Sequence, residues 1–197
     1  CGNLEDDLKK LAECDWIIEV VLEKLEVKHD VYKKVASVKK PDAIVASNTS
    51  TLPLHDLTAP LGDEFARHFM IMHFFNPPRF MRLLEVVQGK VSDADFARAC
   101  DFGDRVLGKT IVRCKDTPGF IANRIGVYWL MLALYKAMDM GISVPQADAV
   151  MGKPLGIPKT GVFGLFDLIG IDLMPLIAKS LMGSLPESDA FRKLYKE

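Results

Sequence analysis

Apolar and polar positions in the first part of the chain follow two alternating patterns, short β-branched runs and longer stretches with helical spacing. The stretch 27–38 places a valine on one helix face every third or fourth residue, and its other face is rich in lysine, which indicates a solvated surface. Strands are predicted over residues 16–22, 43–47, 69–75, 83–87 and 110–114, with a further helix over 93–107. Strands that alternate with helices favour an α/β fold with a largely parallel sheet, covered by helices on both faces.

The pattern changes after Lys115, where helical spacing replaces the short runs. Thr117 and Pro118 are typical of a helix start, because threonine caps a helix well and proline suits its first position. Helices are expected over residues 120–140, 144–151 and 166–182. We therefore predict an α/β domain over residues 1–115 and an all-α domain over residues 116–197.

Composition and charge exclude several classes of protein. A net charge of −1 gives no general attraction for nucleic acid or for an anionic membrane. The longest strongly apolar stretch, 125–135, is shorter than the roughly 20 residues that span a bilayer. Four scattered cysteines without a C-x-x-C pair argue against a metal site and against a disulfide framework. With no secretory signal in view, we expect a cytoplasmic protein with no membrane span, no metal and no nucleic-acid partner.

One motif suggests a nucleoside-triphosphate site but stands in the wrong context. Residues Gly103 to Thr110 match G-x-x-x-x-G-K-[ST], a pattern that in a P-loop follows a strand and opens a helix. Here the predicted helix precedes the motif and a strand follows it. We interpret Gly108 as the cap that ends the helix, and Lys109 as a charge that favours the negative end of that helix.

A histidine and a glutamate on successive predicted strands are the best candidates for catalysis. His73 lies near the end of an apolar run, before Asn76 and two prolines, and ligands bind at the carboxyl ends of strands in parallel sheets. Glu85 is the only charge in the run 83–87, and a buried carboxylate needs a partner. A His–Glu pair suits a general base near neutral pH, so we predict a separation of about 2.6–3.2 Å. The alternative is a solvated histidine and an edge-strand glutamate.

Two further segments place polar residues where elements begin or end. Residues 47–51, with the sequence Ser-Asn-Thr-Ser-Thr, follow a predicted strand and therefore face the same crevice as His73. Their alternative interpretation is a helix-capping cluster. Asn123 begins a very apolar helix, where an amide is out of place unless it is hydrogen-bonded, and its alternative is a packing residue beside Arg124.

Together these segments resemble the 3-hydroxyacyl-CoA dehydrogenase family over essentially the whole chain. The matching segments, in the family's order, are Ile17 to Glu23, Ser47 to Ser50, His73 to Pro77, Leu84 to Val86 and Lys115 to Arg124. The resemblance implies a truncated Rossmann-type sheet followed by an all-α C-terminal domain. It also implies a module of a longer, bacterial, multifunctional β-oxidation protein.

The resemblance further implies NAD-dependent oxidation of (S)-3-hydroxyacyl-CoA to 3-oxoacyl-CoA. His73 would take the proton from the 3-hydroxyl group, and Glu85 would stabilise the imidazolium. Ser50 and Asn123 would hold the reacting oxygen or the thioester of the acyl-CoA substrate. The residues expected to line the nicotinamide and ribose side of NAD are Glu19, Lys24, Ser50 and Asn76.

The sequence departs from the family pattern in one respect, because it contains no G-x-G-x-x-G turn. In the family this turn precedes the segment that begins here at Cys1, and it gives the pyrophosphate of a dinucleotide a helix N-terminus. We therefore expect this chain by itself to form half of an active site, to bind NAD very weakly and to show negligible turnover.

The helical part is expected to form a homodimer. Residues 128–134 are apolar nearly all round the predicted helix, which is more than one core face requires. Such a surface is normally covered by a partner. The resemblance also implies dimerisation through this domain.

Two other functions compete with the dehydrogenase. One is a non-catalytic structural relative, since the family includes an abundant lens crystallin, although the presence of both His73 and Glu85 argues for catalysis. The other is a sister β-hydroxyacid dehydrogenase, but members of that group generally use a catalytic lysine instead of a His–Glu pair.

Overall fold

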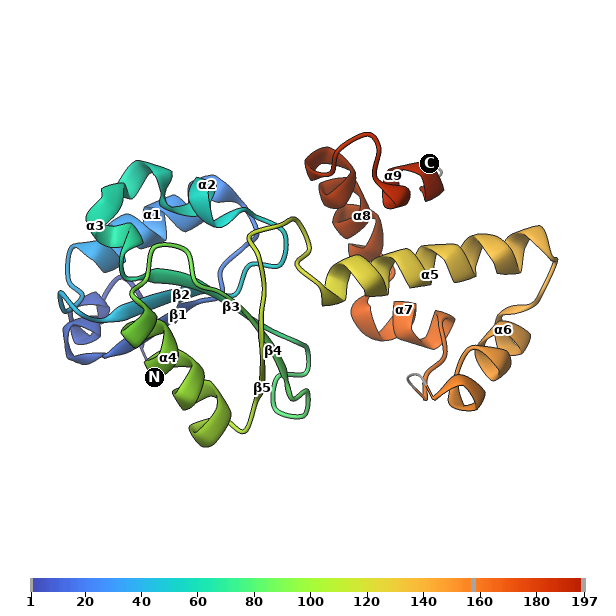
Figure 1. Ribbon diagram of the computed structural model, residues 1–197, viewed down its shortest axis with the longest axis horizontal. Helices are drawn as coiled ribbons and strands as arrows, with labels where there is room; N and C mark the ends of the chain where they lie inside the picture. The colour runs from blue at the N-terminus through green and yellow to red at the C-terminus, as the bar shows by residue number, and fades with distance from the viewer. Residues whose placement is uncertain (1, 157–158, 196–197) are drawn as a thin grey trace. The chain divides into compact units, whose positions relative to one another are not determined.

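The computed structural model describes residues 2–156 and 159–195 of the chain (Figure 1). Two compact units make up the chain, Cys1–Phe120 and Ile121–Glu197. The first unit contains the strands together with several helices, and the second is helical in the part that is described. They separate at the turn that follows the last strand of the first unit.

The first unit contains a five-stranded sheet with the order β1-β2-β3-β4-β5. Its strands are β1 (Trp16–Glu19), β2 (Ile44–Ser47), β3 (Phe69–Phe74), β4 (Leu83–Val87) and β5 (Thr110–Arg113). The predicted α/β fold with a largely parallel sheet is confirmed, and β3 with β4 is the antiparallel exception. The exception has a simple cause. Only the loop 75–82 joins these strands, whereas a parallel pair needs a crossover of about a dozen residues or more.

Helices cover both faces of the sheet. The first face carries α1 (Leu25–Ala36), α2 (Leu54–Thr58) and α3 (Gly62–Ala66), and the second carries α4 (Asp93–Asp101) (Figure 1). Side chains of a strand alternate between faces, so the odd-numbered residues of β1 to β4 point toward α1. The core of that face includes Ile17, Tyr32, Val45, Phe65, Phe69 and Ile71, and the core of the other includes Ala46, Met70, Met72, Leu84, Val86 and Phe96.

Several element ends differ from the prediction for local reasons. Strand β1 stops at Glu19 instead of residue 22, because the Glu19 carboxylate accepts the Val21 N–H at 2.6 Å and turns the chain. Helix α4 continues as a π-helical turn, Phe102–Val106, and Gly108 ends it with φ at 65°, in agreement with the predicted cap. Helices α2 and α3 and the 3₁₀ turn Ala59–Leu61 were not predicted, whereas the 3₁₀ turn Leu8–Glu13 lies where Leu4, Leu8 and Leu11 recur at helical spacing.

The interpretation of the lysine-rich face of α1 as solvated is wrong for one residue. The exposed fraction of Lys28 is only 1%, and Tyr32 one turn later is fully buried. The pattern misplaced the buried face because a lysine normally counts as polar and exposed. Here carboxylates of Glu19 and Glu23 compensate the buried ammonium group.

Lys109 also differs from its interpretation as a helix-end charge. Its exposed fraction is 8%, and its ammonium group donates to the carbonyl oxygens of Pro78 and, at 2.8 Å, Met81. The turn at Gly108 directs the side chain away from the helix end and under the loop 75–82. The lysine of the P-loop-like motif therefore anchors the loop that follows β3.

The second unit consists of short helices packed on one long helix. They are α5 (Ala122–Asp139), α6 (Val144–Val150), the 3₁₀ turn Lys153–Leu155, α7 (Phe163–Ile169), α8 (Leu173–Ser184) and α9 (Ala190–Leu194). The predicted helix start at Thr117 is wrong, because residues up to Phe120 form a turn and Phe120 has φ at 45°, outside the helical region. The helix predicted over 166–182 is interrupted at Gly170, where φ is 108°.

No helix within residues 2–156 and 159–195 is long and apolar enough to cross a membrane. Among the same residues, no group of three or more histidine, cysteine or carboxylate side chains is arranged to hold a metal ion.

Candidate functional site

Polar side chains gather on one face of the sheet, at the end where β1, β2 and β3 finish. Glu19 pairs in register with Ser47 across β1 and β2, and His73 pairs with Glu85 across β3 and β4. Neighbours in register point to the same face, so all four side chains point toward the α1 side of the sheet. The apolar core of this face thus ends in a polar layer with two separate buried groups.

The first group is the pair of His73 and Glu85. The Nδ1 atom of His73 lies 2.9 Å from a carboxylate oxygen of Glu85, so the predicted separation is confirmed. Both residues are buried, with exposed fractions of 6% and 1%. A carboxylate can only accept here, so Nδ1 carries the proton and Nε2 is left as the basic nitrogen. Nε2 makes no hydrogen bond with any residue that the structure describes.

Two aromatic rings surround the imidazole of His73. The ring centroid of Phe75 lies 4.5 Å from that of the imidazole, and the ring of Phe120 lies 5.7 Å away. Phe120 is buried and belongs to the core on the α1 side. Apolar neighbours of this kind limit the access of water to the imidazole and strengthen its interaction with Glu85.

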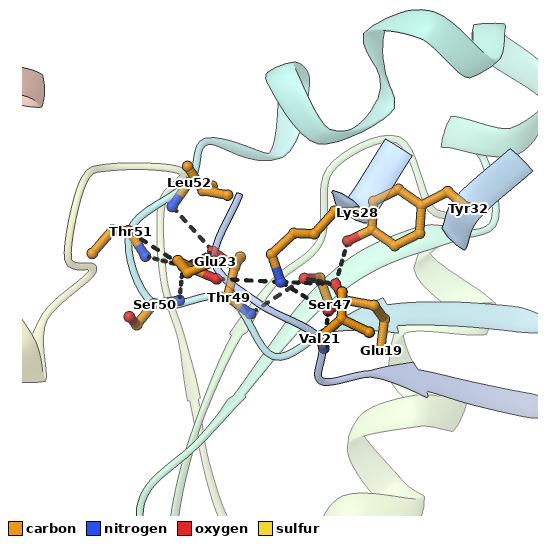
Figure 2. A network of polar contacts seen from close by, with 10 residues as sticks. All are labelled: Glu19, Val21, Glu23, Lys28, Tyr32, Ser47, Thr49, Ser50, Thr51 and Leu52. Atoms are coloured by element: carbon orange, nitrogen blue, oxygen red, sulfur yellow. Dashed lines mark hydrogen bonds and ion pairs between the residues drawn. The ribbon is translucent and has the colours of Figure 1, made fainter. Parts of the chain in front are cut away.

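The second group is centred on the carboxylate of Glu19, which is 4% exposed (Figure 2). Lys28 donates to its two oxygens at 2.8 and 3.0 Å. The hydroxyl groups of Tyr32 and Ser47 donate at 2.5 and 2.8 Å, and the Val21 N–H completes the set. Burial and the adjacent Glu19 raise the pKa of the Tyr32 hydroxyl far above its ordinary value, so Tyr32 remains a donor.

Glu23 extends this group toward the loop that follows β2. One oxygen of its carboxylate lies 3.2 Å from Lys28, and the other accepts from the Thr49 hydroxyl at 2.5 Å and from the Ser50 N–H at 3.0 Å. Burial by itself raises the pKa of Glu23, but the hydrogen bond from Thr49 and the charge of Lys28 outweigh it. The pKa of Glu23 therefore lies below its ordinary value.

The other residues predicted for the site lie in different surroundings. Ser50 is half-buried in the loop after β2 and Asn76 is exposed after β3, and neither side chain has a hydrogen-bond partner within the described part of the chain. Lys24 is exposed before α1 and stays outside the Glu19 group. Asn123 belongs to the second unit, in the first turn of α5. The site roles of all four, and the cofactor contact of the buried Glu19, stay predictions.

Two residues that shape the site, Lys28 and Asp116, had no predicted role in it. Lys28 was assigned to a solvated face. However, Tyr32 lies four residues later on the same helix face, which indicates that this face packs against other residues. Asn48, from the segment 47–51 predicted to face the crevice, accepts the Phe74 N–H at 2.8 Å and so joins the ends of β2 and β3. Asp116 accepts the Leu54 N–H at 3.0 Å and caps α2, a contact between distant segments for which the sequence has no signal.

Comparison with known proteins gives a consistent family. Residues 2–117 match the family model described as "3-hydroxyacyl-CoA dehydrogenase, NAD binding domain", and residues 119–197 match the model of the C-terminal domain of the same enzyme. A protein of Rickettsia felis named "Putative fatty acid oxidation complex trifunctional enzyme" is 50% identical over 195 residues, which are 98% of this chain and 27% of that protein. A protein of Deinococcus radiodurans named "Probable 3-hydroxyacyl-CoA dehydrogenase" is 40% identical, over 96% of this chain and 55% of that protein.

Solved structures agree with these sequence matches. FadB2 of M. tuberculosis superimposes with a TM-score of 0.85 at 32% identity, over 94% of this chain and 64% of that one. The (S)-3-hydroxybutyryl-CoA dehydrogenase PaaH1 of Ralstonia eutropha gives a TM-score of 0.79 at 30% identity, over 90% of this chain and 62% of that one.

The chain spans between about a quarter and just over half of the length of the curated relatives that it matches first. Within that span, both family models match and together they cover nearly every residue. The fold, with its mixed sheet followed by a helical unit, is that of the matched structures. The chain belongs to the 3-hydroxyacyl-CoA dehydrogenase family.

Proposed function

We propose that the protein oxidises (S)-3-hydroxyacyl-CoA to 3-oxoacyl-CoA with NAD as the oxidant, in fatty-acid β-oxidation. The observation that carries the proposal is the buried contact between His73 and Glu85, at 2.9 Å. A buried imidazole with one nitrogen held by a carboxylate and the other without a partner in the described chain is suited to general-base catalysis. The matches to both family models support the same reaction.

In this reaction Nε2 of His73 takes the proton from the 3-hydroxyl group of the substrate. The carboxylate of Glu85 then stabilises the imidazolium through the proton on Nδ1. The oxygen forms a carbonyl group with C3 as the C3 hydrogen leaves with its electron pair. Ser50 and Asn123 are proposed to bind the reacting oxygen or the thioester, which limits the motion of C3 before it reacts.

The residues present fit the nicotinamide side of NAD. The Ser50 hydroxyl and the Asn76 amide lie beyond the ends of adjacent strands and have no hydrogen-bond partner among residues 2–156 and 159–195. They are proposed to hold the nicotinamide and ribose, with Lys24 nearby on the exposed turn before α1. When bound, NAD supplies the hydride acceptor. Because the carboxylate of Glu19 is buried, its proposed effect on the cofactor is indirect, through the residues that cover it.

The experiment that tests this function uses the full-length protein with NAD and a series of 3-hydroxyacyl-CoA substrates of increasing chain length. We expect NADH to form with every substrate of the S configuration and with none of the R configuration. Failure to form NADH with any (S)-3-hydroxyacyl-CoA would exclude the proposed reaction and favour a non-catalytic relative.

We also propose a homodimer that forms through the helical unit. Apolar side chains of α5 remain exposed, with fractions of 67% for Ile125 and 69% for Met138. These exposed side chains are the observation that supports a partner, whereas Leu130 and Met131 of the predicted segment 128–134 pack in the core of their own unit. Sedimentation of the full-length protein at tens of micromolar is expected to give a dimer, and a monomer at that concentration would exclude it.

We propose that the protein works in the cytoplasm. The half-buried thiols of Cys14 and Cys100 form no disulfide. Unpaired thiols of this kind persist in reducing compartments. Cell fractionation followed by immunodetection is expected to find the protein in the cytoplasmic fraction, and its recovery from a secreted fraction would contradict the proposal.

A further inference from the structure

Lys28 is the one described residue that contacts both carboxylates beside the end of β1. Its ammonium nitrogen lies 2.8 Å from Glu19 and 3.2 Å from Glu23, and its exposed fraction is 1%. Glu19 lies beneath it, saturated by donors from Tyr32 and Ser47. Glu23 lies at the outer end, with 38% of its side chain exposed. The cluster therefore runs from the sheet interior to the surface (Figure 2).

At that outer end a single carboxylate oxygen of Glu23 orders the loop after β2. It accepts from the Thr49 hydroxyl at 2.5 Å, the Ser50 N–H at 3.0 Å, and both the N–H and the hydroxyl of Thr51 at 3.2 Å. Thr49 in turn accepts the Leu52 N–H at 3.0 Å. Three consecutive residues of a loop thus depend on one oxygen atom, and the middle one is Ser50.

A purely stabilising role does not account for this geometry. A buried ion pair adds little net stability over apolar residues of the same volume, so two carboxylates around one ammonium group are a poor device for stability alone. The same arrangement can instead fix the orientation of the Glu23 carboxylate. The ion pair with Lys28 fixes one oxygen of Glu23, and the other is then directed at the loop.

We propose that Lys28 and Glu23 are positioning residues that fix Ser50, with Glu19 and Tyr32 as their buried support. The part of this proposal that concerns catalysis rests on the proposed dehydrogenase function. Glu23 holds the backbone of Ser50, which leaves the Ser50 hydroxyl available for a ligand. A displacement of about 1 Å in a group that orients a substrate lowers turnover by up to roughly 100-fold.

The first test measures hydrogen exchange of the Ser50 and Thr51 amides in the full-length protein without substrate. Glu23→Ala removes every acceptor, and we expect exchange at both amides to become at least about tenfold faster, the loss of one hydrogen bond of about 1.4 kcal/mol. Glu23→Gln keeps one carbonyl oxygen and should lie between Glu23→Ala and the unmodified protein. Glu26→Gln, at an exposed glutamate three residues later in the first turn of α1, is the matched control and should change neither amide.

The second test compares the kinetics of the same variants. We expect kcat of Glu23→Ala to fall about 10- to 100-fold with a smaller change in KM, and Glu23→Gln to recover part of the loss. Lys28→Met is measured beside them and should also speed exchange at Ser50, because it removes the cation that holds Glu23. If Lys28→Met fails to fold, Tyr32→Phe, which keeps the buried ring, replaces it and should speed that exchange by a smaller factor.

The outcomes separate the two proposals. Unchanged exchange at Ser50 and Thr51 in Glu23→Ala overturns the ordering of the loop. Faster exchange with unchanged kcat overturns the positioning role. If the unmodified protein oxidises no 3-hydroxyacyl-CoA, the proposed function fails, and the positioning role in catalysis fails with it. The exchange data still decide whether Glu23 orders the loop, because they need no substrate.

Discussion

The two buried polar groups on the α1 face of the sheet differ in how many of their hydrogen-bonding atoms the protein occupies. The carboxylate of Glu19 accepts hydrogen bonds from Lys28, Tyr32, Ser47 and the Val21 N–H. The protein therefore satisfies both of its oxygen atoms. The imidazole of His73 is held on one side by Glu85 and has no hydrogen-bond partner on the other within the described chain. A saturated group is suited to support, and a half-saturated group is suited to proton transfer.

This difference predicts which property each substitution changes. Loss of a partner in the saturated group leaves a buried charge without compensation, which lowers the free energy of unfolding. Loss of the half-saturated imidazole removes a reacting group while the packing around it survives.

His73→Gln should abolish most activity and leave stability nearly intact. The glutamine amide keeps a donor for the buried Glu85, so the fold is retained, but it cannot accept a proton at neutral pH. We expect kcat to fall by about 100- to 10,000-fold, measured as NADH formation in the full-length protein. His55→Gln, at a histidine whose side chain is 74% exposed, is the control and should keep full activity. Full activity of His73→Gln would contradict the assignment of the base.

Lys28→Met, unlike His73→Gln, should greatly lower the free energy of unfolding. It leaves Glu19 buried without its cation, and removal of one partner from a buried ion pair costs about 3–5 kcal/mol. Urea denaturation measures the change. Lys34→Met, at an exposed lysine of the same helix, should stay within about 0.5 kcal/mol of the unmodified protein. A loss at Lys28 no larger than at Lys34 would mean that the buried pair is not coupled as the distances indicate.

Tyr32→Phe should have a smaller effect on the same group. It removes one hydrogen bond to the Glu19 carboxylate and keeps the ring that packs against Phe65 and Phe69. A hydrogen bond to a charged group contributes about 1.5–3 kcal/mol, so the free energy of unfolding should fall by that amount or less. Equal losses for Tyr32→Phe and Lys28→Met would contradict the central position of the lysine.

The pH dependence of stability should carry a small contribution from Glu23. Its pKa in the folded protein lies below the ordinary value of 4.5, so its contribution is fully present above that pH and is lost as the pH falls through the folded-state pKa. Glu23→Gln should therefore flatten the acid limb of a stability–pH curve measured by urea denaturation from about pH 6 to about pH 3. An unchanged acid limb would contradict the pairing of Glu23 with Lys28.

Much of the buried pair of His73 and Glu85 could be predicted because its signal is local. Glu85 is a lone charge in an apolar strand, and a strand that cannot solvate a charge implies a partner. The short loop after β3 then makes the next strand antiparallel, which places Glu85 opposite His73. The Glu19 group could not be predicted in this way, because its members come from a strand, a helix and a loop whose contacts depend on how these elements pack.

Three features could be derived from the order of the amino acids: the alternation of strands and helices in the first unit, the helical second part, and the contact between His73 and Glu85. These follow from hydrophobic periodicity and from a rule that applies within a few residues, that a buried charge requires compensation. The burial of Lys28 and the hydrogen bond from the Ser50 N–H to Glu23 became evident only from the packed structure. The reason is physical: the partners that make a buried lysine tolerable are assembled by packing, and spacing along the chain does not record them.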